Sequence, residues 1–157
     1  MTDQKGDDWT KWADDFRCMS AAAFVVISEY KKEKQSLITR AVAGVPTIIY
    51  TIAGMMKKEL VGYEWVLADG VYENMIDREL IQLDSIHEAS SYNIPHFVGF
   101  SIEKSIGLGG IYSIGFVSER EPENLLGNVV LITPRGKRLD DYEPLIAHGK
   151  NVSRQLM

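Results

Sequence analysis

The sequence contains a single cysteine, Cys18, in 157 residues. One thiol excludes an internal disulfide and any metal site built from several cysteines. No stretch approaches the ~18 uninterrupted apolar residues that a membrane-spanning helix requires. The first residues are polar and acidic, without the basic start and apolar run of a secretory signal. These absences predict a cytoplasmic chain that makes no membrane contact through this segment.

An excess of positive charge is also missing, because the net charge is −5. The short basic runs lie beside acidic residues or at predicted turns, so solvated turns explain them better than a phosphate-binding surface. Nucleic acid is therefore not expected as a partner. The apolar fraction of 45% is ordinary for a soluble domain with a core. Without a repeat or a linker, we expect one domain over residues 1–157, with residues 1–6 disordered.

The usual catalytic and metal-binding patterns are missing together. The three histidines, His87, His96 and His148, have no metal-type spacing. Cys18 lies late in a predicted helix, where the helix dipole disfavours a thiolate. The glycines of residues 107–110 follow a predicted helix and precede a strand, which reverses the phosphate-binding order. We therefore expect no metal site and no enzyme, with a small enzyme that uses His87 or His96 as a base as the weaker alternative.

The patterns that are present predict an α+β fold. β-Branched and aromatic runs predict strands at residues 23–30, 36–43, 111–117 and 127–133. Apolar residues at helical spacing predict helices from residue 7 or 8, at 46–62, at 95–107 and from 142 to the end. Residues 64–67 suggest a short extended piece, and residues 78–90 give mixed signals for one short strand or helix. Helices around a mostly antiparallel sheet are the expected arrangement.

Strict alternation assigns the side chains of two predicted strands to opposite faces. In residues 36–43, one face takes Leu37, Thr39 and Ala41, and the other takes Ile38, Arg40 and Val42. In residues 111–117, one face takes Tyr112, Ile114 and Phe116, and the other takes Ile111, Ser113 and Val117. Alternation does not say which layer each face meets.

The two terminal helices carry heavy apolar stripes. The stripe residues are Trp9, Trp12 and Phe16 in the first helix, and Tyr142, Leu145, Ile146 and Val152 in the last. Such stripes can fill the core of one chain or pack against a second copy, and the sequence leaves both open. Doubled across a two-fold axis they would form a four-helix bundle, so a homodimer is expected. The last helix has no stop signal, and we expect it to continue into another module.

Three segments resemble the GAF domain family, in particular the GAF domains of sensor histidine kinases. The ending is the most similar part: IYSIGFV at 111–117, a charged loop, LLGNVVLITPRGK at 125–137, and DDYEPLIAHGKNVSRQLM at 140–157. AFVVISEYKKEKQSLITRAVAG at 23–44 and IPHFVGFSIEKSIGLGGIYSIGF at 94–116 resemble the family's opening and middle. The resemblance covers residues 8–157 and rests on hydrophobicity and glycines.

The resemblance implies a central antiparallel sheet with the N- and C-terminal helices packed together on one face and the middle helices on the other. It implies a non-catalytic sensory domain of a two-component signalling protein, which binds a small molecule and relays the signal through its terminal helices. The pocket-lining residues would be Phe97, Phe100, Tyr112, Ile114 and Phe116, with Tyr50 and His96 as polar contacts.

The ligand and cofactor stay unknown at this stage. A covalent bilin is disfavoured because the family's attachment cysteine lies in the middle of the domain, whereas this chain has only Cys18. The family's cyclic-nucleotide pattern is not visible, and its sulfoxide reductases need several cysteines. Haem or a metal held by His96 remains open. The alternative function is a ligand-free dimerisation scaffold.

Overall fold

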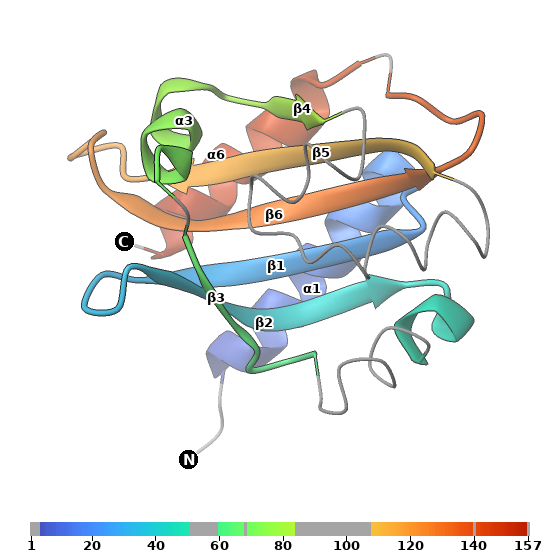
Figure 1. The fold of residues 1–157 in the computed structure, drawn as a ribbon, viewed down its shortest axis with the longest axis horizontal. Helices are drawn as coiled ribbons and strands as arrows, with labels where there is room; N and C mark the ends of the chain where they lie inside the picture. The colour runs from blue at the N-terminus through green and yellow to red at the C-terminus, as the bar shows by residue number, and fades with distance from the viewer. Residues whose placement is uncertain (1–3, 51–59, 68, 84–107, 140, 157) are drawn as a thin grey trace.

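The protein, described here by a computed structural model, is placed over residues 4–50, 60–67, 69–83, 108–139 and 141–156. Its sheet has six strands in the order β3-β2-β1-β6-β5-β4, and every neighbouring pair is antiparallel (Figure 1). The strands are β1 (Phe24–Lys31), β2 (Ser36–Gly44), β3 (Glu64–Val66), β4 (Ile81–Leu83), β5 (Leu108–Val117) and β6 (Leu125–Pro134). The helices are α1 (Gln4–Ser20), α3 (Val71–Asp77) and α6 (Glu143–Leu156), and residues 46–50 are also helical. The predicted α+β class with an antiparallel sheet is confirmed.

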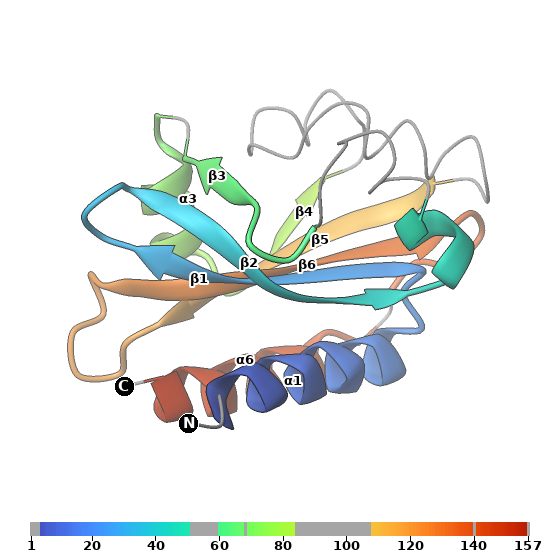
Figure 2. The same ribbon diagram turned by 90° about the horizontal axis from the view of Figure 1, so that it is seen from below.

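The two terminal helices lie side by side on one face of the sheet, as predicted (Figure 2). We call this the helix face, and the opposite side of the sheet the distal face. The apolar core on the helix face is built from α1, α6 and the four central strands. Its ring contacts include Phe16 on Phe116, with ring centroids 6.1 Å apart, and Trp9 edge-on to Trp12 at 5.1 Å. These large side chains fill the space between the helices and the sheet.

A second core covers the distal face, and α3 and residue 48 contribute to it. Its buried members are Ala23, Phe24, Leu37, Ile48, Leu60, Val71, Met75, Ile81, Leu83, Ile111, Leu125 and Ile132. Burial of a large apolar side chain contributes about 1.5–3 kcal/mol, so both layers stabilise the domain. No helix among the described residues is long and apolar enough to cross a membrane.

A bulge in β2 inverts the predicted faces of the residues beyond it, Ala41 and Val42. In the β1–β2 pairing, Ile27 faces Ala41, but the next residue, Ser28, faces Thr39. Arg40 is therefore an extra residue in β2 with no partner position in β1. Leu37 therefore packs in the distal core, whereas Ala41 packs in the helix-face core. The prediction that Leu37 and Ala41 share a face is wrong, because one inserted residue inverts the alternation beyond it.

Several element boundaries differ from those predicted. Helix α3 is not among the predicted helices; it is seven residues long and follows Gly70, whose backbone lies in the left-handed region (φ 86). Helix α1 begins at Gln4, ahead of Asp7 or Asp8. Strands β5 and β6 each begin a few residues earlier than their apolar runs indicate. The mixed signals near residue 80 correspond to β4, which pairs with β5 at the edge of the sheet.

Candidate functional site

Four buried polar side chains form a row across the distal face. They are Thr39 of β2, Ser28 of β1, Asn128 of β6 and Ser113 of β5, each no more than 3% exposed. Ser28 lies directly opposite Thr39 on one side and Asn128 on the other. Ser113 alternates with Tyr112 and Ile114, which belong to the helix-face core, so it points to the distal side. We call these four residues the polar row.

One hydrogen bond joins two members of the polar row, and another joins the row to Trp65 of β3. The Trp65 indole Nε1 donates to the Thr39 hydroxyl at 2.6 Å, and the Asn128 amide Nδ2 donates to the Ser113 hydroxyl at 3.5 Å, a long contact. A hydroxyl or amide buried without a partner costs about 1–3 kcal/mol, so polar side chains in an apolar layer need a reason. The row offers donors and acceptors but no ionised group, and no charged side chain of the described residues is fully buried. Its chemistry therefore suits neutral polar atoms.

The residues predicted to line a ligand pocket lie in different places. Tyr112, Ile114 and Phe116 are buried in the helix-face core, and their side chains point away from the distal face. Tyr50 is 78% exposed, and the structure does not bring it to these three. His96, Phe97 and Phe100 lie outside the described residues. A ligand-binding role for the set stays a prediction.

The residues predicted for a dimer interface pack within a single chain. Trp9, Trp12, Phe16, Leu145 and Val152 are each at most 5% exposed and belong to the helix-face core. The remaining two, Tyr142 and Ile146, are half-buried. Of the two sequence interpretations, core filling describes this arrangement, and an interface between copies would use the outer surface of the helices.

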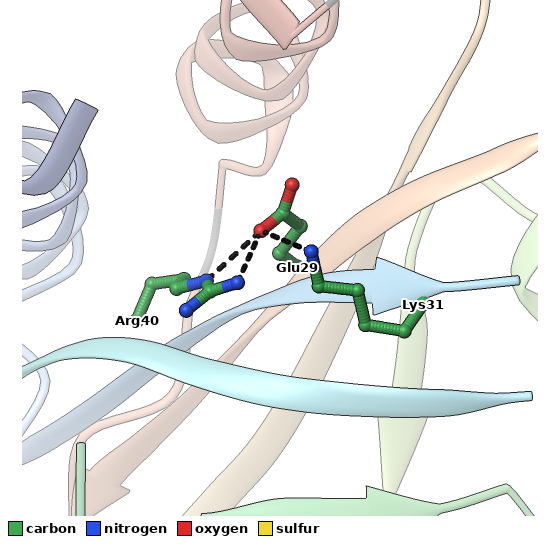
Figure 3. A network of polar contacts seen from close by, with 3 residues as sticks. All are labelled: Glu29, Lys31 and Arg40. Atoms are coloured by element: carbon green, nitrogen blue, oxygen red, sulfur yellow. Dashed lines mark hydrogen bonds and ion pairs between the residues drawn. The ribbon is translucent and has the colours of Figure 1, made fainter. Parts of the chain in front are cut away.

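Glu29, Lys31 and Arg40 form a small ionic cluster at the bulge in β2 (Figure 3). Arg40 Nε and Nη2 lie 2.9 and 2.7 Å from Glu29 Oε1, and Lys31 Nζ lies 3.4 Å from the same oxygen. Burial raises the pKa of the Glu29 carboxyl, but the hydrogen bond and charge of Arg40, together with Lys31, outweigh burial and hold that pKa below its usual value. The cluster has a structural role, because it pairs the residue that the bulge adds.

His148 lies at the contact of the two terminal helices. Its ring packs on Phe16 at 4.4 Å, and its Nε2 lies 3.9 Å from Asp15 Oδ2 without a hydrogen bond. Burial lowers the pKa of the His148 imidazole, although the Asp15 carboxylate and the Trp12 backbone favour the charged form and Lys11 opposes it. Burial between α1 and α6 therefore favours the neutral form of this histidine. The described residues contain no group of three or more side chains suited to hold a metal.

Sequence reasoning did not find the polar row. Each member is a serine, threonine or asparagine within an otherwise apolar strand, and that was the available signal. The row becomes visible only when β2, β1, β6 and β5 are aligned, and strand register is not readable from a single sequence.

Comparison with known proteins bears on the fold. No protein-family model and no curated protein matches this sequence. A solved bacteriophytochrome from the photosynthetic bacterium R. palustris matches 96% of this chain with a TM-score of 0.66 and 10% identity. The GAF domain/HD domain protein from Geobacter sulfurreducens matches 93% of this chain and 87% of its own, with a TM-score of 0.63 and 9% identity. This chain has a GAF-like fold.

A far-red cyanobacteriochrome photoreceptor also shares the GAF-like fold, with a TM-score of 0.63 and 11% identity over 94% of this chain and 84% of that one. The expected fold resemblance is thus confirmed. At these identities the similarity concerns the fold alone. The GAF-like chain spans about a third of the R. palustris bacteriophytochrome, at 33% of its length.

Proposed function

We propose that this chain is a sensory GAF domain that binds a small molecule over the polar row of the distal face. The observation that carries the proposal is the difference between the two faces of one sheet. The central strands meet α1 and α6 with apolar side chains such as Val25, Ile27 and Leu131, whereas they direct four neutral polar side chains to the distal side. The structurally similar photoreceptors support a sensory role for this fold.

The chemistry of the row limits the ligand. Hydroxyl and carboxamide groups bind neutral hydrogen-bonding atoms and give orientation and specificity within an apolar site. A bilin attached through a cysteine is disfavoured, because Cys18 is exposed on α1, on the helix face of the sheet. We therefore propose a non-covalent ligand whose contact with the row is uncharged.

The relay to α6 would pass around the β4 edge of the sheet. Tyr142, just before α6, donates from its hydroxyl to Gln82 Oε1 of β4 at 3.3 Å, and Lys150 of α6 lies 3.7 Å from Glu79 Oε2. A ligand that favours one position of α3 and β4 would shift the population of positions of α6. A coupling of about 1–3 kcal/mol is the usual scale of such regulation. We also propose that the chain forms a homodimer, lies in the cytoplasm and acts on an output module such as a histidine kinase.

The test is a thermal-shift screen of nucleosides, haem and small metabolites against the unmodified chain. A ligand at about one hundred times its dissociation constant adds ~2.7 kcal/mol of stability. The double variant Asn128→Ala/Ser113→Ala should fold and lose the shift, whereas Val130→Ala on the same face should keep it. A hit unaffected by the double variant would place the ligand elsewhere.

The ligand-free scaffold remains the second candidate. The observation in its favour is that the row already makes two hydrogen bonds within the chain. Absence of any stabilising compound, together with a concentration-dependent dimer in sedimentation, would support the scaffold and contradict the sensory proposal.

A further inference from the structure

We propose a second binding site, independent of the distal-face site, in a groove at the end of the sheet between the β1–β2 turn and α3. The groove has a volume of about 450 Å³, and its walls include Tyr30, Lys32, Gln35, Asp69, Tyr72 and Glu73. Its chemistry matches a small zwitterion of the size of a free amino acid. None of the polar-row residues lines it, so the two sites are separable by mutation.

An aromatic wall forms one side of the groove. The rings of Tyr30 and Tyr72 pack with their centroids 5.3 Å apart and their planes tilted by 53°. Tyr72 is held in place because its hydroxyl donates to the Glu123 carbonyl at 2.7 Å and accepts from the Leu125 backbone N–H at 3.2 Å. A wall fixed in this way offers an apolar surface without much loss of side-chain entropy when a ligand binds.

Both signs of charge border the groove. Lys32 extends from the β1–β2 turn, and Asp69 and Glu73 come from the start of α3 on the other side. Within the described part of the chain, these three side chains make no ion pair, whereas the neighbouring Lys34 pairs with Glu64 at 3.5 Å. A ligand that carries an ammonium and a carboxylate can compensate both signs, which neither a simple anion nor a simple cation does.

The wall also connects the groove to the terminal helix. Tyr30 and Tyr72 also line a smaller groove of about 230 Å³, whose other walls include Leu126 and Leu156. Leu156 is the last residue of α6. The two rings therefore connect the groove to the final turn of α6, a route different from the β4 edge.

The experiment is an NMR titration of the isotope-labelled full chain with the standard free L-amino acids, one at a time up to about 10 mM, a range that detects weak binding. We expect at least one to shift the amide signals of Gly70, Tyr72 and Glu73. Its carboxamide and its N-acetyl form, each lacking one charge, should bind more weakly than the free amino acid.

Charge-removing variants test the contacts. Lys32→Met and Glu73→Gln should each weaken binding by about two- to fivefold, the range for an exposed charge pair. The matched controls Lys34→Met on the same turn and Asp77→Asn on the same helix should leave binding unchanged. No shift with any amino acid, or a carboxamide that binds as well as the zwitterion, would overturn the proposal. The double variant Asn128→Ala/Ser113→Ala should bind as the unmodified chain does, which separates this test from that of the distal-face site.

Discussion

The two faces of the sheet are built from the same central strands, yet they differ in kind. The helix face meets α1 and α6 through stacked aromatic rings and aliphatic side chains, and Gly149 lets α6 approach so closely that a Cβ there would lie 3.1 Å from Ile114 Cγ2. The distal face carries the polar row within its apolar core. The helix face is filled mainly by apolar side chains, whereas the distal face also buries four polar side chains, and the hydroxyls of Thr39 and Ser113 accept hydrogen bonds within the chain. We therefore expect function on the face whose core also carries polar groups.

The largest effect should come from removing a ring on the helix face. Phe116→Ala deletes a fully buried ring that stacks on Phe16. We expect a loss of about 3–5 kcal/mol in the free energy of unfolding, measured by urea denaturation. Val117→Ala, the next residue on the distal face, should cost about 1 kcal/mol. Equal losses would remove the contrast between the faces.

A smaller loss should follow from Arg40→Met at the bulge. This change removes the hydrogen bonds to Glu29, at a cost of about 1–2 kcal/mol at neutral pH. Because the folded state lowers the pKa of Glu29, the stabilisation is present above about pH 4.5 and is lost as the pH falls through the folded pKa. The variant should therefore lose less stability than the unmodified chain between neutral and acidic pH.

The control for Arg40→Met is Lys34→Met, which removes a more exposed pair and should change the unfolding free energy by less than about 0.5 kcal/mol. An unchanged acid dependence in Arg40→Met would show that the cluster does not lower the pKa of Glu29.

The third effect concerns pH at the contact between α1 and α6. Burial lowers the folded pKa of His148 below its usual 6.5, so the unfolded chain takes up the proton first. Stability is then greatest above about pH 6.5 and falls with acidification by at most about 1.4 kcal/mol per pH unit from this residue. The variant His148→Leu should lack this contribution in urea unfolding at a series of pH values. If His148→Leu and the unmodified chain show the same pH dependence of the unfolding free energy, Asp15 offsets the effect of burial on His148.

The smallest effect on stability should come from Lys150→Met at the β4 edge. The pair with Glu79 is exposed, so its loss should change the unfolding free energy by less than about 0.5 kcal/mol. The same variant should reduce the ligand-induced change in hydrogen exchange of α6, because it removes one link between the faces. Asn151→Ala, an exposed neighbour on α6, serves as the control. If Lys150→Met keeps the full ligand-induced change in hydrogen exchange of α6, the β4 edge is excluded as the route of the relay.

Much of the fold was predictable because periodicity reports local structure. The alternation of Tyr112, Ile114 and Phe116 in β5 and the stripes of the terminal helices are properties of short segments, and the structure confirms the packing of these helices together. Alternation does not reveal which layer covers which face, so the side of the sheet that Tyr112 and Phe116 occupy required the assembled structure. The bulge at Arg40 has no local signal, and α3 is too short for helical periodicity.

The candidate site was harder to predict because it is assembled across strands. Ser28, Thr39, Ser113 and Asn128 are single polar residues in four separate segments. The pairing of β1 with β2 and β6, and of β6 with β5, brings them together in one row. The groove at the end of the sheet depends likewise on the position of α3, which brings Tyr72 to Tyr30.

The strand order has a consequence for how the molecule assembles. At the centre of the sheet β1 pairs with β6, so Phe24 meets Ile132 from near the opposite end of the chain. The β1–β2 and β5–β6 hairpins can form from local sequence, but neither buries a complete layer alone. Joining them closes the longest loop between paired strands of the described sheet, and such non-local pairing slows folding. On the ribosome, the edge of β1 in the newly made first hairpin must therefore stay without its strand partner until β6 has emerged.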